Sequence, residues 1–166
     1  MSTSRGGLDR SYVTIVVVLM LVLPGGSTVI ELVHRGSTAD AIAVVGKWFG
    51  FWAIGVRLLT AGLRQVLRPS FTAEAIFHVS SPECLPIVRE LGFANFCLGT
   101  GAVVSLFAPS WRLGAVCVGG LYFAIAGIQH VIKKPAGPNE VVAMASDLLI
   151  AAIAAAYVVS ATACAA

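Results

Sequence analysis

The sequence predicts an all-α integral membrane protein, a helical bundle with five transmembrane helices and a short interfacial helix. Three observations predict it. Of the 166 residues, 58% are hydrophobic and only 11% are charged, whereas roughly a quarter of the residues of a soluble domain are charged. Five apolar stretches each reach about the 20 residues that a helix needs to cross the hydrocarbon core. The short breaks between these stretches are rich in Gly, Pro and Ser, which favour turns.

The expected helices form one transmembrane domain, residues 1–166. The first apolar stretch follows basic residues, as in a signal peptide, but its apolar character resumes after Gly26 and no small-residue cleavage site follows. We therefore expect a retained first helix that is kinked near Pro24, while cleavage would leave a bundle of four helices. The expected spans are about 11–34, 43–66, 86–107, 111–132 and 141–162.

The distribution of Lys and Arg predicts the orientation, because cytoplasmic loops carry an excess of these residues. With five spans, seven basic residues fall on the side of the N-terminus and three on the other side, while Arg57 lies within a helix. The N-terminus is therefore expected in the cytoplasm and the C-terminus outside. The seven are Arg5, Arg10, Arg64, Arg68, Arg89, Lys133 and Lys134, and the three are Arg35, Lys47 and Arg112.

The segment RPSFTAEAIFHVSSPE, residues 68–83, is too short and too polar to cross a membrane. Thr72 is expected to cap a short helix, with Glu74 in the first turn, where the helix dipole favours an anion. Such a helix, with one apolar side, lies at the cytoplasmic interface. The apolar side consists of Phe71, Ala75, Ile76 and Val79.

Arg57 is the most costly residue of the apolar stretches. An arginine near the centre of a bilayer costs on the order of 2.5–3.5 kcal/mol, so its guanidinium needs an anion, a polar cavity or a route to the headgroups. Arg64 follows seven residues later on the same helix face. We expect a buried polar layer in the cytoplasmic half, a candidate binding site, with Asp147 as the first partner of Arg57. Its residues are Arg57, Arg64, Glu90, Asn95, Gln129, His130 and Asp147.

Two interpretations of this layer stay open. Polar side chains connect helices in lipid, so the layer can be architectural, or it can hold a ligand, a proton or a cofactor. His130 is expected at a helix–helix contact. Haem is disfavoured because His34 is predicted on the opposite side and His78 in the interfacial segment, and no metal site is predicted. Glu31 and His34 are expected to form a smaller polar pair at the opposite face.

Several functional classes are disfavoured by the sequence. It contains no nucleotide-binding loop, zinc-protease motif or nucleophile–base pair, so we name no catalytic residue and expect no catalytic activity from this chain alone. The net charge of +3 is too small to indicate nucleic acid. The cysteines form no C-x-x-C pair and are expected to act as small apolar residues. They are Cys84, Cys97, Cys117 and Cys164.

The runs GKWFGFWAIGVRLLTAGLRQ, RELGFANFCLG, GLYFAIAGIQHV and AMASDLL, in this order, resemble a family of small bacterial membrane proteins with no assigned function. The resemblance extends from about Pro24 to Leu149 and implies a bacterial inner membrane. More distantly, the pattern is similar to DoxX-like four-helix membrane proteins, which implies a redox partner and a quinone as cofactor. The residues that carry this similarity are Arg57, Glu90 with Gly92, Arg112 with Leu113, and His130.

Three functions follow from these observations. The first is an accessory or structural membrane protein in which the polar layer connects the helices. The second is a DoxX-like membrane subunit of a quinone- or sulfur-linked oxidoreductase, in which Arg57, Glu90 and His130 contact a quinone or a partner. The third is a small proton-coupled transporter that uses Asp147 and Arg57. The residues themselves require no cofactor. The expected partners are the lipid bilayer, a membrane or cytoplasmic redox protein, and further copies of this chain.

Overall fold

The computed structural model describes residues 8–163 except 76, 78 and 136, and within these residues every regular element is helical. Five helices are long and apolar enough to cross a membrane, which confirms the predicted number of helices of this kind. Each observed helix extends beyond the predicted apolar stretch by a few residues at one or both ends, because polar residues and caps continue the helix. The five helices are Arg10–Arg35, Ala41–Leu67, Pro82–Val104, Pro109–Lys133 and Pro138–Ala163.

The first long helix adapts to Pro24 without breaking. It consists of α1 (Arg10–Val17), a π-helical segment η1 (Val18–Val22) and α2 (Leu23–Arg35). Proline has no N–H to donate and its ring crowds the carbonyl one turn earlier, and the π segment directly before Pro24 accommodates it. The Thr28 hydroxyl then donates a 2.7 Å hydrogen bond to the Pro24 carbonyl.

A second π segment lies in the second long helix, which consists of α3 (Ala41–Phe49), η2 (Gly50–Val56) and α4 (Arg57–Leu67). The segments η1 and η2 pack against each other. Because a π turn contains one additional residue, the residues before and after η2 do not follow one α-helical periodicity. The orientation of Arg57 therefore depends on η2.

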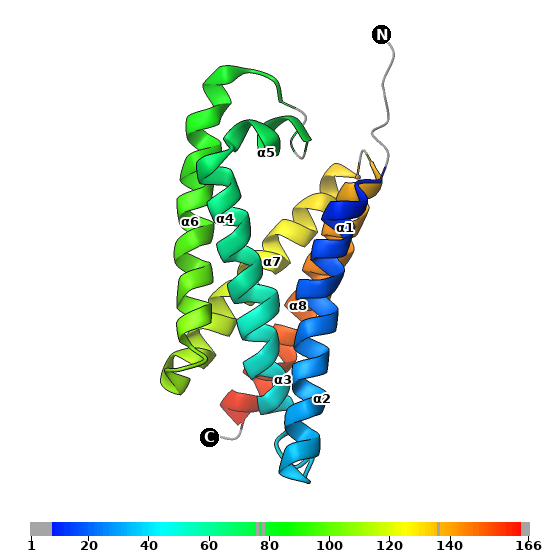
Figure 1. Ribbon diagram of the computed structural model, residues 1–166, viewed down its shortest axis with the longest axis vertical. Coiled ribbons are helices and arrows are strands. Elements are labelled where there is room, and N and C mark those ends of the chain that lie inside the picture. Colours follow the sequence, from blue (N-terminus) through cyan, green and yellow to red (C-terminus); the bar gives the residue numbers. More distant parts are fainter. Residues whose placement is uncertain (1–7, 76, 78, 136, 164–166) are drawn as a thin grey trace.

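The expected interfacial helix is α5 (Pro69–Ala75), which lies across the end of α4 (Figure 1). It begins earlier than predicted, because Pro69 suits the first turn of a helix. Thr72 is therefore not the N-cap but a buried residue inside α5, with 6% of its surface exposed. Ile76 and His78 lie outside the described residues.

The third and fourth long helices begin with short 3₁₀ turns, η3 (Pro82–Cys84) before α6 (Leu85–Val104) and η4 (Pro109–Trp111) before α7 (Arg112–Lys133). The last helix is α8 (Pro138–Ala163). The start of α1, helix α5 and the connection between α7 and α8 lie at one end of the bundle, hereafter the α5 end (Figure 1). The α2–α3 connection and the end of α8 lie at the opposite end, as five consecutive spans require.

Glycines allow the closest approach between helices, at the α4–α6 contact. Gly62 faces Gly92, and Gly99 faces the backbone of Leu59. A Cβ atom on Gly99 would lie 2.4 Å from the Leu59 nitrogen, and one on Gly62 would lie 2.6 Å from the Gly92 carbonyl oxygen. Small residues on both helices let the backbones touch. On α6, Gly92 and Gly99 are seven residues apart, and this spacing places them on one face, toward α4.

Substitution of two glycines of α6 tests this contact. Gly99→Ala should destabilise the protein by about 1–3 kcal/mol, because a methyl group would press on the α4 backbone, which cannot move aside alone. Gly101→Ala is the matched control, since no atom lies within 4 Å of its Cβ position, and its Tm should stay the same or rise through better helix propensity. The measurement is thermal unfolding of the detergent-purified protein, and equal Tm values for the two variants would contradict this packing.

Candidate functional site

Arg57 lies inside the bundle, at the first position of α4 and directly after η2. Its side chain is half-buried. The guanidinium carbon lies 6.0 Å from the centre of the Tyr12 ring on α1, and the Tyr12 hydroxyl also interacts with the guanidinium. The Nε atom is buried and has no hydrogen-bond partner among the described residues. Arg57 is thus enclosed by protein but not fully paired.

Asp147 on α8 is the carboxylate that interacts electrostatically with Arg57. No direct salt bridge within 4.0 Å joins the two groups among the ion pairs of the described residues. The predicted partner of Arg57 is therefore nearby, but its carboxylate is separated from the guanidinium.

Asn95 on α6 contributes an amide to the same region and is almost completely buried, with 2% of its surface exposed. Its Nδ2 donates a 2.8 Å hydrogen bond to Oε1 of Gln65 on α4, which is also buried. Its Oδ1 is buried and has no partner in the described chain. The hydroxyl of Tyr122 on α7 interacts with Asn95, and it also lies within electrostatic reach of Arg57 and Asp147.

Each of the five long helices therefore contributes to one polar region. Three of its residues were predicted from the sequence, and three were not. The only sequence signal for the two tyrosines was their polar tip inside an apolar stretch, where a buried hydroxyl needs a partner. We call this region the Arg57 cluster; it consists of Tyr12, Arg57, Gln65, Asn95, Tyr122 and Asp147.

Glu90 and Gln129 of the predicted layer are exposed rather than buried. The position of each residue around its helix explains why its side chain is exposed. Glu90 lies two residues before Gly92, which is on the buried face of α6, and Gln129 lies two residues after Gly127, which is on the buried face of α7. Two residues turn an α-helix by about 200°, so both side chains point away from the bundle. The prediction that they are buried was wrong.

Arg64 lies nearer the α5 end than Arg57 does, and His130 lies nearer that end than Tyr122 does. Arg64 is exposed, and its guanidinium carbon lies 4.4 Å from the centre of the Phe71 ring on α5. It shares a helix face with Arg57 as predicted, but it reaches the surface and was wrongly placed in the buried layer. His130 is half-buried. It follows Tyr122 by eight residues, which is about 12 Å along α7.

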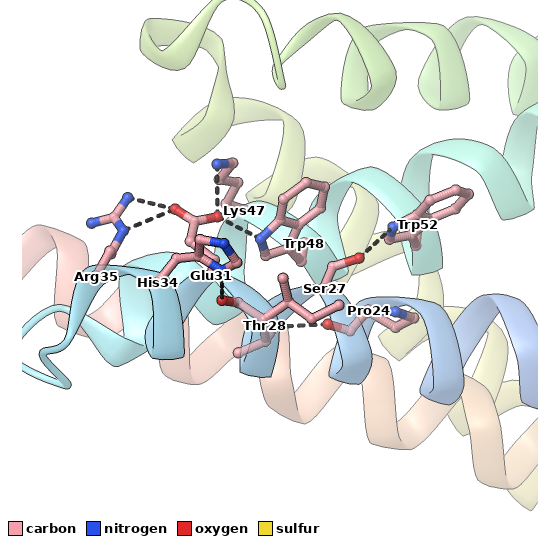
Figure 2. A network of polar contacts seen from close by, with 10 residues as sticks. Pro24, Ser27, Thr28, Glu31, His34, Arg35, Lys47, Trp48 and Trp52 are labelled. Carbon is pink, nitrogen blue, oxygen red and sulfur yellow. Dashed lines mark hydrogen bonds and ion pairs between the residues drawn. The ribbon is translucent and has the colours of Figure 1, made fainter.

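A second polar network lies near the α2–α3 connection, with Glu31 at its centre (Figure 2). One carboxylate oxygen accepts hydrogen bonds from Arg35, at 3.0 Å from Nε and 2.5 Å from Nη2. The other accepts from Lys47 Nζ at 2.8 Å and from the Trp48 indole at 2.6 Å. His34 does not pair with Glu31 as expected; its Nδ1 bonds to the Ile30 carbonyl at 3.0 Å.

The Glu31 network fastens α2 to α3. Both carboxylate oxygens are used, and Trp52 adds a hydrogen bond of 3.2 Å to the Ser27 hydroxyl on the facing helix (Figure 2). Charge-assisted bonds of this kind are stronger than neutral ones. With its acceptors occupied by the protein itself, this network has the properties of a structural clasp.

Neither a metal site nor a disulfide is found in the described part of the chain. Within these residues, no three His, Cys, Asp or Glu side chains come together as metal ligands. Cys84, Cys97 and Cys117 are free thiols, while Cys164 lies outside the described residues.

The fold and the cluster define a class of protein: a bundle of five helices suited to a membrane, with a polar centre shared by all five. The chain belongs to DUF6790, a family of unknown function, whose pattern matches residues 11–165. This finding agrees with the resemblance to an uncharacterised family and extends it over nearly the whole chain. No curated protein and no solved structure matches the chain.

The clasp can be tested by removing its charge. Glu31→Gln keeps the shape of the side chain but turns an amide NH₂ toward groups that are all donors, so we expect a loss of about 1–3 kcal/mol in stability. Asp40→Asn, at the same end of the bundle, is the control, because the exposed Asp40 side chain makes no capping hydrogen bond. Thermal unfolding in detergent measures both. An unchanged Tm for Glu31→Gln would show that the network contributes little.

Proposed function

We propose that this protein is a multi-pass membrane protein that holds the polar headgroup of a small lipid-soluble molecule, of the quinone class, at the Arg57 cluster. One observation carries the proposal. A buried donor, Arg57 Nε, and a buried acceptor, Asn95 Oδ1, both lack partners among the described residues, although groups from five helices surround them.

The contrast with the Glu31 network supports binding over a purely architectural role. Buried polar groups in proteins are nearly always paired, and leaving one unpaired costs about 1–3 kcal/mol. The Glu31 carboxylate uses both oxygens, so this chain can build a complete network where only structure is needed. The Arg57 cluster instead leaves a donor and an acceptor available to a ligand.

The chemistry of the Arg57 cluster suits a quinone headgroup. Quinone oxygens can accept hydrogen bonds from the guanidinium and from the hydroxyls of Tyr12 and Tyr122, and two aromatic rings favour a flat molecule. The similarity to DoxX-like proteins supports the same class of ligand, although Glu90 is exposed and only Arg57 of that set belongs to the cluster.

The proposed location is the bacterial inner membrane, with the N-terminus in the cytoplasm. The distribution of basic side chains supports this orientation, because the α5 end carries most of them. A membrane or cytoplasmic redox protein, or further copies of this chain, are the proposed partners. A proton-coupled transporter is less well supported, because helices broken at mid-membrane are typical of such proteins, and α2 is continuous through Pro24.

The proposal predicts that a short-chain ubiquinone analogue, decylubiquinone, raises the Tm of the detergent-purified protein, since a ligand of the folded state stabilises it by mass action. Arg57→Gln should abolish the rise. Thr60→Val is the control on the same helix, because the Thr60 hydroxyl bonds only to carbonyls of its own helix, at 2.8 and 3.0 Å, and the rise should persist.

If the Arg57 cluster has a purely architectural role, the Tm measurements should give different results. If decylubiquinone leaves the Tm of the unmodified protein unchanged in both redox forms, and Arg57→Gln strongly lowers it, then the Arg57 cluster is architecture. The protein would then be an accessory or structural membrane component.

A further inference from the structure

We infer that Gln65 is a positioning residue that makes the Arg57 cluster select a ligand carrying both a hydrogen-bond donor and an acceptor, the hydroquinone form rather than the quinone. The inference rests on the proposed function and specifies its ligand. It follows from the orientation of one amide group.

The Asn95 amide can present either a donor or an acceptor to a ligand, because it carries an NH₂ group and a carbonyl oxygen. In this structure its Nδ2 is used, since it donates to Gln65 Oε1 at 2.8 Å. What remains is Oδ1, buried and without a partner among the described residues. Asn95 therefore offers an acceptor.

Gln65 is held in place by the glycine contact between α4 and α6. Gly92 lies so close to it that a Cβ atom there would be 2.9 Å from Gln65 Cβ. Gln65 itself is 8% exposed. Its Oε1 is thus fixed against α6 one turn from Gly92, where Asn95 lies. The packing of two backbones sets the direction of the Asn95 amide.

Arg57 supplies the complementary feature. A guanidinium has only donors, and Arg57 Nε is buried and unpaired within the described chain. Tyr122 interacts with Asn95 and lies within electrostatic reach of Arg57, which links the helix that carries the acceptor to the helix that carries the donor. A ligand that matches both must accept a hydrogen bond and donate one.

A hydroxyl group meets both requirements, and a hydroquinone carries two hydroxyls. A quinone has only carbonyl acceptors, so it would satisfy Arg57 and leave the Asn95 oxygen buried and unmatched. Sites built to bond a hydroxyl discriminate strongly against analogues that lack it. We expect the hydroquinone to bind roughly tenfold more tightly than the quinone, or better.

The test compares three matched probes on the full-length protein in nanodiscs under anaerobic conditions: decylubiquinone, its hydroquinone, and the dimethyl ether of that hydroquinone. For the unmodified protein, the Kd of the hydroquinone should be the lowest by roughly tenfold or more. Gln65→Met keeps the length of the side chain but removes the acceptor, so the Asn95 amide can turn and the ratio of quinone to hydroquinone Kd should fall toward one. Thr60→Val should keep the ratio.

The outcomes separate the two proposals. Equal binding of the quinone and the hydroquinone to the unmodified protein would overturn the inference and leave the proposed function intact. No binding of any probe would overturn the proposed function, and the inference with it. The probe series on the unmodified protein decides the ligand preference even if Gln65→Met does not fold. A retained ratio in folded Gln65→Met would show that Gln65 does not position Asn95.

Discussion

The guanidinium of Arg57 is the constraint on which the interior of this protein depends. Ten residues separate it from Leu67 at the end of α4, about 15 Å along the axis, which is too far for the side chain to reach the end of the bundle. Its desolvation must therefore be offset inside the protein. A ring and hydroxyl from α1, an amide from α6, a hydroxyl from α7 and a carboxylate from α8 gather around it. The cost of one residue thus determines which side chains the other four helices must direct inward.

Close backbone packing makes this arrangement specific. Interhelical hydrogen bonds in lipid contribute little individually, so a polar cluster alone does not fix the register of two helices. The glycine faces of α4 and α6 do so, because even a methyl group at Gly62 or Gly99 would overlap backbone atoms. With this register fixed, Gln65 and Asn95 lie opposite each other and one hydrogen bond defines the amide orientation. The glycines thus fix how the two helices pack, and the few polar residues supply the hydrogen-bonding groups.

The sequence was sufficient for the coarse architecture, because length and hydropathy alone mark helices that can cross a bilayer. It also indicated Arg57, Asn95 and Asp147, since polar groups in apolar stretches are costly wherever they lie. It was insufficient for Glu90 and Gln129, which lie on exposed faces of their helices. The distance along the chain indicates how far a residue lies from the end of its helix. The direction of its side chain depends instead on the helical phase, which packing decides and which a π segment such as η2 shifts. The pairing of Gln65 with Asn95 required the α4–α6 register.

The two polar networks divide the bundle into a fastened end and a less constrained one. At the α2–α3 end, Glu31 joins two helices through four donor groups. Toward the α5 end, α4 and α6 diverge from α1, α7 and α8 (Figure 1), and the described contacts of α4 are chiefly with α6, η2 and α5. The Arg57 cluster takes residues from both groups of helices: Arg57, Gln65 and Asn95 from α4 and α6, and Tyr12, Tyr122 and Asp147 from α1, α7 and α8. A site between diverging helices can adjust at a lower cost than one inside the packed core, because fewer packed contacts must be broken.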